Sequence, residues 1–373
     1  MPIDHLERPS YFPEMTKRSK DRRGYRKISV QVPIGEKKIA GWPVSGDDLK
    51  PIKNLDGRPS KRIREEGSRG YFKDAQGYWR RTDTNIDVDF DNLCAATHGH
   101  IRRSIISDVE FEIFHDRIPD WVHMAGVEPE SRVTKAQFEK LIAGSASERV
   151  LHKFIYLQDV QGLLTNVQRT SAQVSQVIGE FYGILNDCAP YLYSINETVG
   201  LRSSVGAETS LLHAHLETIF VRMRSLLDYA VKISLEAERD DIDYSKIVKL
   251  KGGSRQYGDK KSLTMNERAG TLFVKDELIW TICSIRDRIV HDGHLDISAR
   301  LYESFKRNRL VERFVLIPDM AEGRFEVFKN RSNFYGRDHK INHDLPRIYD
   351  DFFQRMLNTI GALHDLYALK RLR

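Results

Sequence analysis

The stretch ERVLHKFIYLQDVQGLLTNVQRTSAQVSQVIGEFYGILND, residues 148–187, decides the fold class of this 373-residue chain. Apolar residues recur along it at spacings of three and four, which is typical of a helix with one buried face. Pro190 follows shortly after and cannot continue a helix. The stretch predicts one long helix, or two abutting helices, in a helical protein.

Three more helical patterns follow this stretch. Residues 207–238 form a second pattern, and its apolar stripe consists of Leu212, Leu216, Ile219, Met223, Leu227 and Ala230. The third runs over residues 265–291, with Thr264 and Glu267 as a capping box and Gly293 as its C-terminal stop. The fourth begins near Asp344 and Pro346, and its stripe consists of Tyr349, Phe352, Met356, Ile360, Leu363 and Tyr367.

The region before residue 130 looks different. Short β-like runs, RKISVQV (26–32), KKIAGWPV (37–44) and VEFEIF (109–114), are separated by Gly, Pro and Asp turns. A hairpin is also expected between the third and fourth helices, from ERFVLIPD (312–319) and GRFEVFKN (323–330). We therefore expect a mainly α chain: a basic, partly β or flexible region at 1–130, then a helical bundle at 131–373 with a small β-hairpin insertion.

Composition limits the class of protein. No apolar run reaches the roughly 18 to 20 residues of a membrane span, and the N-terminus lacks a signal-peptide core, so we expect a cytoplasmic location and no membrane contact. The three cysteines are isolated, without a C-x-x-C pair. Cys94, His98 and His100 in CAATHGH could be metal ligands, but histidines outside a spaced cluster are more often polar residues with protein partners. We expect no metal and no cofactor.

Positive charge is concentrated at the N-terminus. Residues 1–81 hold 20 Lys and Arg against 11 Asp and Glu, an excess of nine, whereas the remaining residues hold 39 against 42. Cations alternate with aromatic residues in KRSKDRRGYRK (17–27) and in RPSKRIREEGSRGYFKDAQGYWRR (58–81), which ends in Arg80 and Arg81. Cations neutralise phosphates and aromatic rings stack on unpaired bases, so this mixture favours contact with single-stranded nucleic acid. A solvated leader is the alternative.

A second basic segment, SKIVKLKGGSRQYGDKK (245–261), connects the second and third helical patterns. It lacks the G-K-[ST] ending of a P-loop. Its glycines and cations could hold an RNA backbone, and the candidate RNA-binding residues are Lys249, Lys251, Arg255, Lys260 and Lys261. A flexible solvated loop would have the same composition.

The stretch TICSIRDRIVHDGH, residues 281–294, ends the third helix with an unusual set of charges. At 100° per residue, Leu278, Ile282, Ile285 and Ile289 fall on one core-facing stripe. A second stripe, Trp280, Ser284, Asp287 and His291, lies roughly opposite, and Trp280 there suggests a dimer interface. Arg286 and His291 are about 140° apart on a straight helix. They could share a site only if the helix unwinds at His291, or if a second copy brings the two together.

At these residues the chain resembles the HEPN superfamily, the higher eukaryotes and prokaryotes nucleotide-binding domains. Arg286, Asp287 and His291 match its motif of Arg, a polar residue, three more residues and His at the end of an apolar helix. VRMRSLLDYAVKI (221–233) is similar to the family's second long helix, and the resemblance covers residues 148–370. It implies a dimeric bundle of four to five helices and, in many members, a metal-independent endoribonuclease of toxin–antitoxin or antiviral defence systems.

The resemblance assigns roles that suit RNA chemistry. The 2′-OH of RNA attacks the adjacent phosphate, leaving a 2′,3′-cyclic phosphate and a 5′-OH. His291 would transfer protons near neutral pH, and Arg286 would hold the phosphate and stabilise its added charge. Asp287 would orient an imidazole or an arginine, and Arg288 would contact RNA. As partners we expect RNA, a second copy of the chain and a cognate antitoxin or regulator.

Two other functions fit the same residues. In a non-catalytic HEPN-like scaffold, Arg286 and Asp287 would pair across a dimer. In a nucleic-acid or nucleotide-binding regulator, the N-terminal charge would provide the affinity. An Arg paired with Asp at the negative end of a helix would also account for the charges without any active site.

Overall fold

The computed structural model describes residues 71–74, 78–81, 86–115, 122, 125–144, 148–187, 200–258, 263–296, 298–307 and 309–370. This part is mainly helical, with short antiparallel strands. The α-helices are α1 (Ile86–Ile105), α2 (Asp108–His115), α4 (Lys135–Gly144), α5 (Arg149–Asp187), α6 (Ala207–Ala237), α7 (Glu277–Asp292) and α8 (Ile341–Lys370). None of the helices described combines the length and the apolar composition that a membrane crossing requires.

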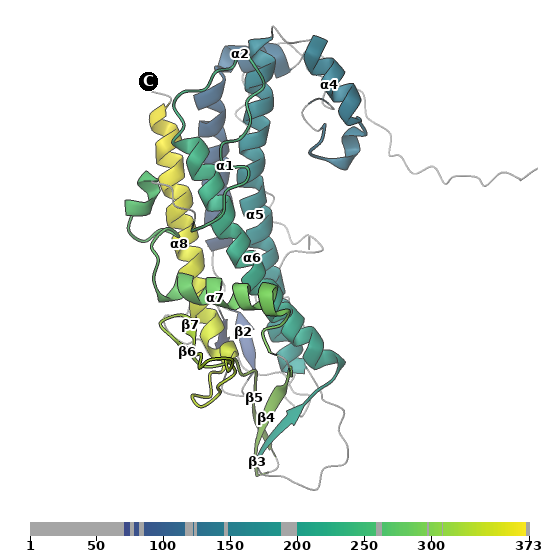
Figure 1. The fold of residues 1–373 in the computed structure, drawn as a ribbon, viewed down its shortest axis with the longest axis vertical. Helices are drawn as coiled ribbons and strands as arrows, with labels where there is room; N and C mark the ends of the chain where they lie inside the picture. Colours follow the sequence, from purple (N-terminus) through teal and green to yellow (C-terminus); the bar gives the residue numbers. More distant parts are fainter. Residues whose placement is uncertain are drawn as a thin grey trace, which may run out of the picture. The chain divides into compact units, whose positions relative to one another are not determined.

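The body of the fold is a bundle in which α1, α5, α6 and α8 run side by side (Figure 1). α5 packs along α6, and α1 packs against both α5 and α8. The predicted helices at 148–187 and 207–238 are confirmed as α5 and α6, and α5 is continuous over 39 residues. Because α1 precedes residue 130, the core of the bundle uses residues from both sides of the predicted domain boundary.

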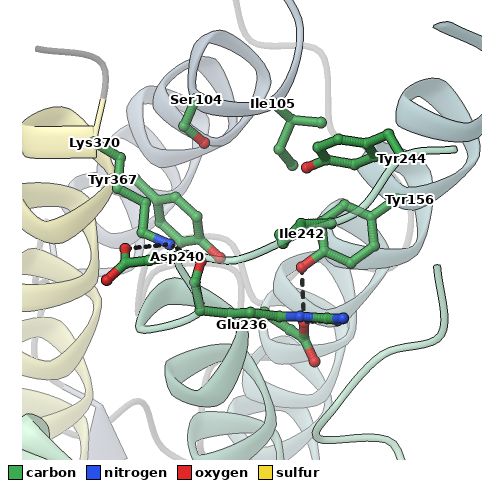
Figure 2. A pocket seen from close by; sticks show the side chains of 10 residues that line it. Ser104, Ile105, Tyr156, Glu236, Asp240, Ile242, Tyr244, Tyr367 and Lys370 are labelled. Carbon is green, nitrogen blue, oxygen red and sulfur yellow. Dashed lines mark hydrogen bonds and ion pairs between the residues drawn. The ribbon is translucent and has the colours of Figure 1, made fainter. Parts of the chain in front are cut away.

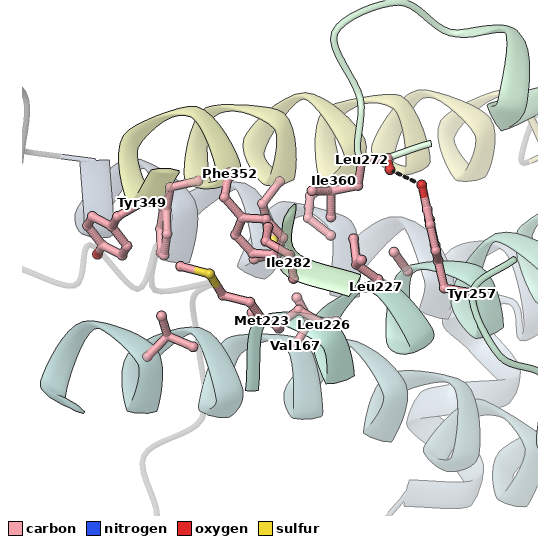
Figure 3. Close-up of a cluster of buried hydrophobic side chains, with 14 of the residues drawn as sticks. Val167, Met223, Leu226, Leu227, Tyr257, Leu272, Ile282, Tyr349, Phe352 and Ile360 are labelled. Carbon is pink, nitrogen blue, oxygen red and sulfur yellow. Dashed lines mark hydrogen bonds between the residues drawn. The ribbon is translucent and has the colours of Figure 1, made fainter. Parts of the chain in front are cut away.

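The core of the bundle is apolar and continuous. All six residues predicted for the α6 stripe are buried, and so are all six predicted for α8. Around its centre lie Val167 of α5, Met223, Leu226 and Leu227 of α6, Ile282 of α7, and Phe352 and Ile360 of α8 (Figure 3). Burying each side chain of this size stabilises the fold by roughly 1.5–3 kcal/mol before entropy is counted.

Helix α8 begins at Ile341, somewhat before the predicted start, and contains Pro346. A proline lacks the N–H that would bond the carbonyl four residues earlier, which here belongs to Asn342. The Tyr182 hydroxyl of α5 donates to that carbonyl oxygen at 2.8 Å. The helix therefore continues through the proline because α5 supplies the missing donor.

Two expectations for the N-terminal region are wrong within the described residues. VEFEIF (109–114) forms α2, not a strand, because Ser107 and Glu110 make a reciprocal capping box: Ser107 N donates to Glu110 Oε2 (3.1 Å) and Glu110 N to Ser107 Oγ (3.2 Å). The aromatic residues expected to stack on RNA bases are buried, namely Tyr71, Phe72, Tyr78 and Trp79. The runs at 26–32 and 37–44, and Tyr25, lie outside the described residues.

The buried aromatics belong to a small hairpin of β1 (Tyr71–Lys73) and β2 (Trp79–Arg81). Tyr71 stacks on Tyr182 of α5 with ring centroids 4.7 Å apart. Trp79 N donates to Asn186 Oδ1 at 2.9 Å, and Asn186 Nδ2 returns a bond of 2.9 Å to the Trp79 carbonyl. The hairpin is thus part of the bundle core rather than a free nucleic-acid surface.

The hairpin predicted between α7 and α8 is confirmed only in part. A turn does form between the two predicted segments, but the strands differ from those expected. Glu322 and Gly323 make the turn with φ of 51° and 75°, between β6 (Met320–Ala321) and β7 (Arg324–Phe325). Residues of ERFVLIPD instead enter β5 (Arg309–Phe314), which pairs with β4 (Leu301–Lys306) in a sheet completed by β3 (Gly200–Ser204). Pro318 lacks the N–H that a longer strand would need.

Candidate functional site

Helix α7 lies across the long helices of the bundle (Figure 1). Its N-cap is Asp276, whose Oδ1 accepts from Ile279 N at 3.4 Å and which is also bound by both terminal nitrogens of Arg355. The capping box predicted at Thr264 and Glu267 is therefore wrong, because these residues form a separate 3-10 turn. Gly293 ends the helix with φ of 87°, as predicted.

The motif residues lie at the C-terminal end of α7. Arg286 is half-buried, whereas Asp287 and His291 are exposed. Arg286 Nη1 donates to Asp287 Oδ1 at 2.9 Å. Because α7 stays helical to Asp292, His291 does not unwind from it, and about 140° still separates His291 from Arg286. Since the helix does not unwind, only a second copy of the chain could bring Arg286 and His291 into one site.

Arg288 does not face solvent. Its guanidinium donates to the Ser332 carbonyl at 3.1 Å, to Ser332 Oγ at 2.8 Å and to Asn333 Oδ1. Its Cζ lies 4.2 Å from the centre of the Phe325 ring, and only 7% of its side chain is exposed. This placement argues against the predicted RNA contact, because the donors of Arg288 hold the segment after β7 against α7.

Trp280 is also contacted by its own chain. The residue is half-buried, and Arg324 of β7 places its Cζ 4.6 Å from the centre of the Trp280 ring. At the tip of the same hairpin, Gly323 approaches so closely that an added Cβ would lie 2.4 Å from the Glu277 carbonyl oxygen. The exposed part of the stripe predicted as a dimer interface is therefore its C-terminal half, at Asp287 and His291.

A second set of charges on α6 lies beside α7. Arg224 Nη1 donates to Asp228 Oδ1, and Arg224 Nη2 donates to the Tyr257 carbonyl at 2.9 Å. Tyr257 N in turn donates to Asp228 Oδ1 at 2.6 Å. Burial raises the pKa of the Cys283 thiol on α7; the positive charges of Arg224 and Arg286 act to lower it, and the negative charges of Asp287 and Asp228 act to raise it. α6 and α7 pack directly against each other, so this set of charges lies near the seam between the two helices.

The sequence prediction missed Arg224 and Asp228. Their signal was the spacing of four in RSLLD on a helix face that otherwise reads as apolar core, which is the geometry of an ion pair along a helix. What the spacing could not reveal is that the pair also binds both backbone groups of Tyr257, which lies 29 residues after Asp228 in the basic loop.

The basic loop after α6 packs back onto that helix. Gly252 N donates to Glu236 Oε1 at 2.9 Å, and an added Cβ on Gly252 would lie 2.9 Å from Lys232 Cα, so only glycine fits this approach. Lys249 and Lys251 are exposed. Of the other candidate RNA-binding residues, Arg255 is half-buried, and Lys260 and Lys261 lie outside the described residues.

The carboxylate that anchors the loop lies in a cavity of about 310 Å³, here called the Glu236 pocket (Figure 2). Its lining comprises Ser104, Ile105, Tyr156, Glu236, Arg239, Asp240, Ile242, Tyr244, Tyr367 and Lys370. Tyr156 Oη donates to Glu236 Oε2 at 2.7 Å. Burial and then the negative charge of Glu236 raise the pKa of Asp159 on α5 to about 6. This buried carboxylate positions the loop, since its two oxygens join Tyr156 to Gly252.

The other candidates have structural partners. Arg80 of β2 pairs with the buried Asp74 (Nε to Oδ2, 2.9 Å), and Arg81 is half-buried. In CAATHGH, Cys94 is buried, and burial raises its thiol pKa to about 12. His98 contacts Gln168 Oε1 at 3.3 Å. In the part of the chain that the structure describes, no three His, Cys, Asp or Glu side chains gather as metal ligands would.

Comparison of the chain with models of known families, with curated proteins and with solved structures gives no match.

Proposed function

We propose that this chain is a cytoplasmic, homodimeric endoribonuclease of HEPN type that needs no metal ion, and that it acts as a toxin or antiviral-defence effector. The observation that supports this most is the arrangement of the seam. Tyr257, at the end of the basic loop, binds Arg224 and Asp228 on α6, and α6 packs against α7, which carries Arg286. A cationic loop and a solvent-accessible Arg and His are the parts that RNA cleavage requires.

Each motif residue has a role that its position allows. Arg286 is the phosphate clamp, because its paired N–H donors match two phosphate oxygens and its charge stabilises the pentacoordinate state. His291 is the proton-transfer group, since an imidazole titrates near neutral pH. Asp287 accepts from Arg286 Nη1 and so orients the clamp. The 2′-OH of the RNA is the nucleophile, and the products end in a 2′,3′-cyclic phosphate and a 5′-OH.

The proposed site is composite. Arg286 and His291 point in directions about 140° apart on one α7, so one copy supplies the arginine and its mate supplies the histidine. The exposed end of α7, with Asp287 and His291, is the proposed dimer surface, and Trp280 is its half-buried margin. An antitoxin or regulator would act by covering this surface.

A second function is favoured by one observation. The contact between Arg286 and Asp287 occupies part of the guanidinium edge that a phosphate would take. In a non-catalytic dimeric scaffold this pair would simply neutralise the end of α7. Cleavage separates the two functions, because the scaffold leaves RNA intact.

The test is cleavage of total RNA in EDTA by the full chain and by two variants. His291→Ala and Arg286→Ala should each lower cleavage by about 10²-fold or more, with unchanged folding by circular dichroism. His115→Ala is the matched control, because His115 is likewise an exposed histidine in the last turn of a helix. Full activity of either motif variant would remove that residue from the mechanism.

Mixing the two inactive variants tests the composite site. If one copy supplies Arg286 and the other His291, each mixed dimer holds one complete site. Refolding the variants together should then restore about a quarter of the wild-type activity, since half of the dimers are mixed and one of their two sites is intact. If both residues act within one copy, no dimer contains a complete site and activity stays absent.

A further inference from the structure

A second cavity, here called the Tyr257 pocket, lies where the basic loop rejoins the bundle. Its volume is about 540 Å³, within the range of small-molecule and cofactor sites. It is lined by Val231, Leu235, Arg255, Tyr257, Gly258, Leu263, Asn266, Phe273, Val274 and Lys275. The roles proposed for Arg286, Asp287 and His291 do not involve this cavity.

The lining divides into an apolar interior and a cationic rim. Val231, Leu235, Leu263, Tyr257 and Phe273 are all buried and form the interior. Among the described residues of the lining, the polar side chains are Arg255, Asn266 and Lys275, two of which are cations. A ligand for this pocket therefore combines an apolar, flat part with negative charge beside it.

The aromatic wall of the pocket is held rigidly. Tyr257 Oη donates to the Leu272 carbonyl at 2.7 Å, while its backbone is bound by Arg224 and Asp228. The ring of Phe273 lies beside it, with centroids 6.2 Å apart, and Lys275 Nζ lies 5.9 Å from the centre of the Tyr257 ring. A ligand ring would meet a preformed aromatic surface and would not have to order it.

We propose that the Tyr257 pocket binds one unpaired nucleobase of the RNA substrate, with the flanking phosphates on Arg255 and Lys275. The proposal rests on the proposed function, and names the site that holds the strand. A nucleobase is flat and apolar on its faces, and the phosphates beside it carry a negative charge that complements the cations of the rim.

The backbone bonds of Tyr257 connect this pocket to the cleavage site. Arg224 and Asp228 of α6 hold the backbone of Tyr257, and α6 packs against α7, which carries Arg286. In this proposal the phosphates that follow the base run along the contact between α6 and α7 toward Arg286. Base-paired RNA cannot insert a base without first opening the pair, so the pocket selects single-stranded RNA.

The test measures RNA affinity in full-length protein that carries His291→Ala, so that RNA stays intact. The probes are a fluorescently labelled single-stranded RNA of about 12 nucleotides, within the usual site sizes for such strands, and an abasic chain of the same length and charge. The RNA should bind about tenfold more tightly than the abasic chain, as stacking of a base on aromatic side chains supplies.

Two kinds of variant separate base from phosphate binding. Val231→Phe fills the interior and should abolish the preference for RNA over the abasic chain. Lys275→Gln leaves the interior open, so it should weaken the binding of both probes by a few-fold. It should also lower the slope of the logarithm of affinity against the logarithm of salt concentration by about one. Lys135→Gln, on the exposed surface of α4, is the control and should change neither. Lys275→Gln keeps the proposal testable if Val231→Phe fails to fold.

If the protein with an intact pocket binds RNA and the abasic chain equally, the pocket does not bind a nucleobase. If it binds adenosine monophosphate more tightly than the RNA, the pocket is not a site for an RNA strand. Cleavage is measured separately on protein with His291 intact. Base-dependent binding without any cleavage would contradict the proposed nuclease activity and support nucleobase binding in the Tyr257 pocket. Cleavage without a base preference in binding would support the nuclease activity and contradict nucleobase binding.

Discussion

The two sides of α7 contrast sharply, although the same residue types lie on both. Arg288 is buried and bonded to Ser332 and Asn333, whereas Arg286, two residues earlier, is half-buried and bonded to its neighbour Asp287. Two residues correspond to about 200° of helical rotation, so the arginines face opposite ways. Charged residues that are close in the sequence can therefore have different roles on a helix. Those that face the protein stabilise the fold, and those that face solvent can contact a ligand.

The β6–β7 hairpin and the segment after it create this difference. They contact Arg288 through Phe325 and the N-terminal half of the Trp280 stripe through Arg324 and Gly323, and leave Asp287 and His291 in solvent. We therefore expect substitutions on the covered side to lower stability and those at the open end to lower activity. The predictions below test that separation.

The largest effect on stability is expected at Arg288. Arg288→Met keeps much of the volume but removes the charge-assisted hydrogen bonds to Ser332 and Asn333 and the contact with the Phe325 ring, which should lower the free energy of unfolding by about 2–4 kcal/mol. Arg286→Met should change it by no more than about 0.5 kcal/mol, as expected of a residue with little buried contact. Urea denaturation of the two purified variants measures both values, and equal losses would abolish the contrast between the two sides.

A smaller loss is expected at the tip of the hairpin. Gly323→Ala should cost about 2–3 kcal/mol, because the added Cβ meets the α7 backbone and φ is 75°. Gly126→Ala is the matched control, with φ of 77° and nothing within 4 Å of an added Cβ, so it should show only the backbone strain of about 1 kcal/mol. Thermal or urea unfolding compares the two, and a similar loss at both positions would mean that the hairpin does not press on α7.

The smallest effect concerns the start of α7 and depends on pH. Burial disfavours the charge of Asp276, but the hydrogen bond and charge of Arg355 and the N–H of Ile279 outweigh it and lower the pKa of Asp276. A lowered folded-state pKa means that the stabilisation is present above the unfolded-state pKa and is lost as pH falls through the folded-state value. Asp276→Asn keeps a capping side chain and removes the charge.

The wild type should therefore exceed Asp276→Asn in stability by about 1 kcal/mol at neutral pH, a modest figure because the ion pair is partly exposed. The difference should vanish as the pH falls below about 4, the ordinary range of an aspartate. Urea titrations at a series of pH values measure it. A difference that persists in acid would show that the two side chains differ in packing and not in charge.

The long helices were predictable because their signal is local and repeated. The stripes of α6 and α8 each place six apolar residues at helical spacing, and every one is buried. α2 was misread because alternating Val109, Phe111 and Ile113 resemble a strand, although none of them is buried. The capping box at Ser107 and Glu110 is a local signal that would have identified this helix.

The site was only partly predictable, for a different reason. That Asp287 and His291 lie near the end of a helix follows from the sequence around them. The burial of Arg288 depends on residues 44 and 45 positions later, and the fixing of Tyr257 depends on α6. Such long-range contacts leave no periodic pattern, and for the same reason β4 and its pairing with β3 were not expected.

The packing of α1 on α8 has a consequence for synthesis of the chain. Phe90 of α1 contacts Phe353 of α8, with ring centroids 5.7 Å apart, and residues 106–340 separate the two helices. Ribosomes add roughly 5–20 residues per second, so the buried face of α1 waits on the order of ten seconds or longer for its partner. During that time a nascent chain exposes apolar surface that chaperones recognise, and the bundle closes only after its C-terminal helix has left the ribosome.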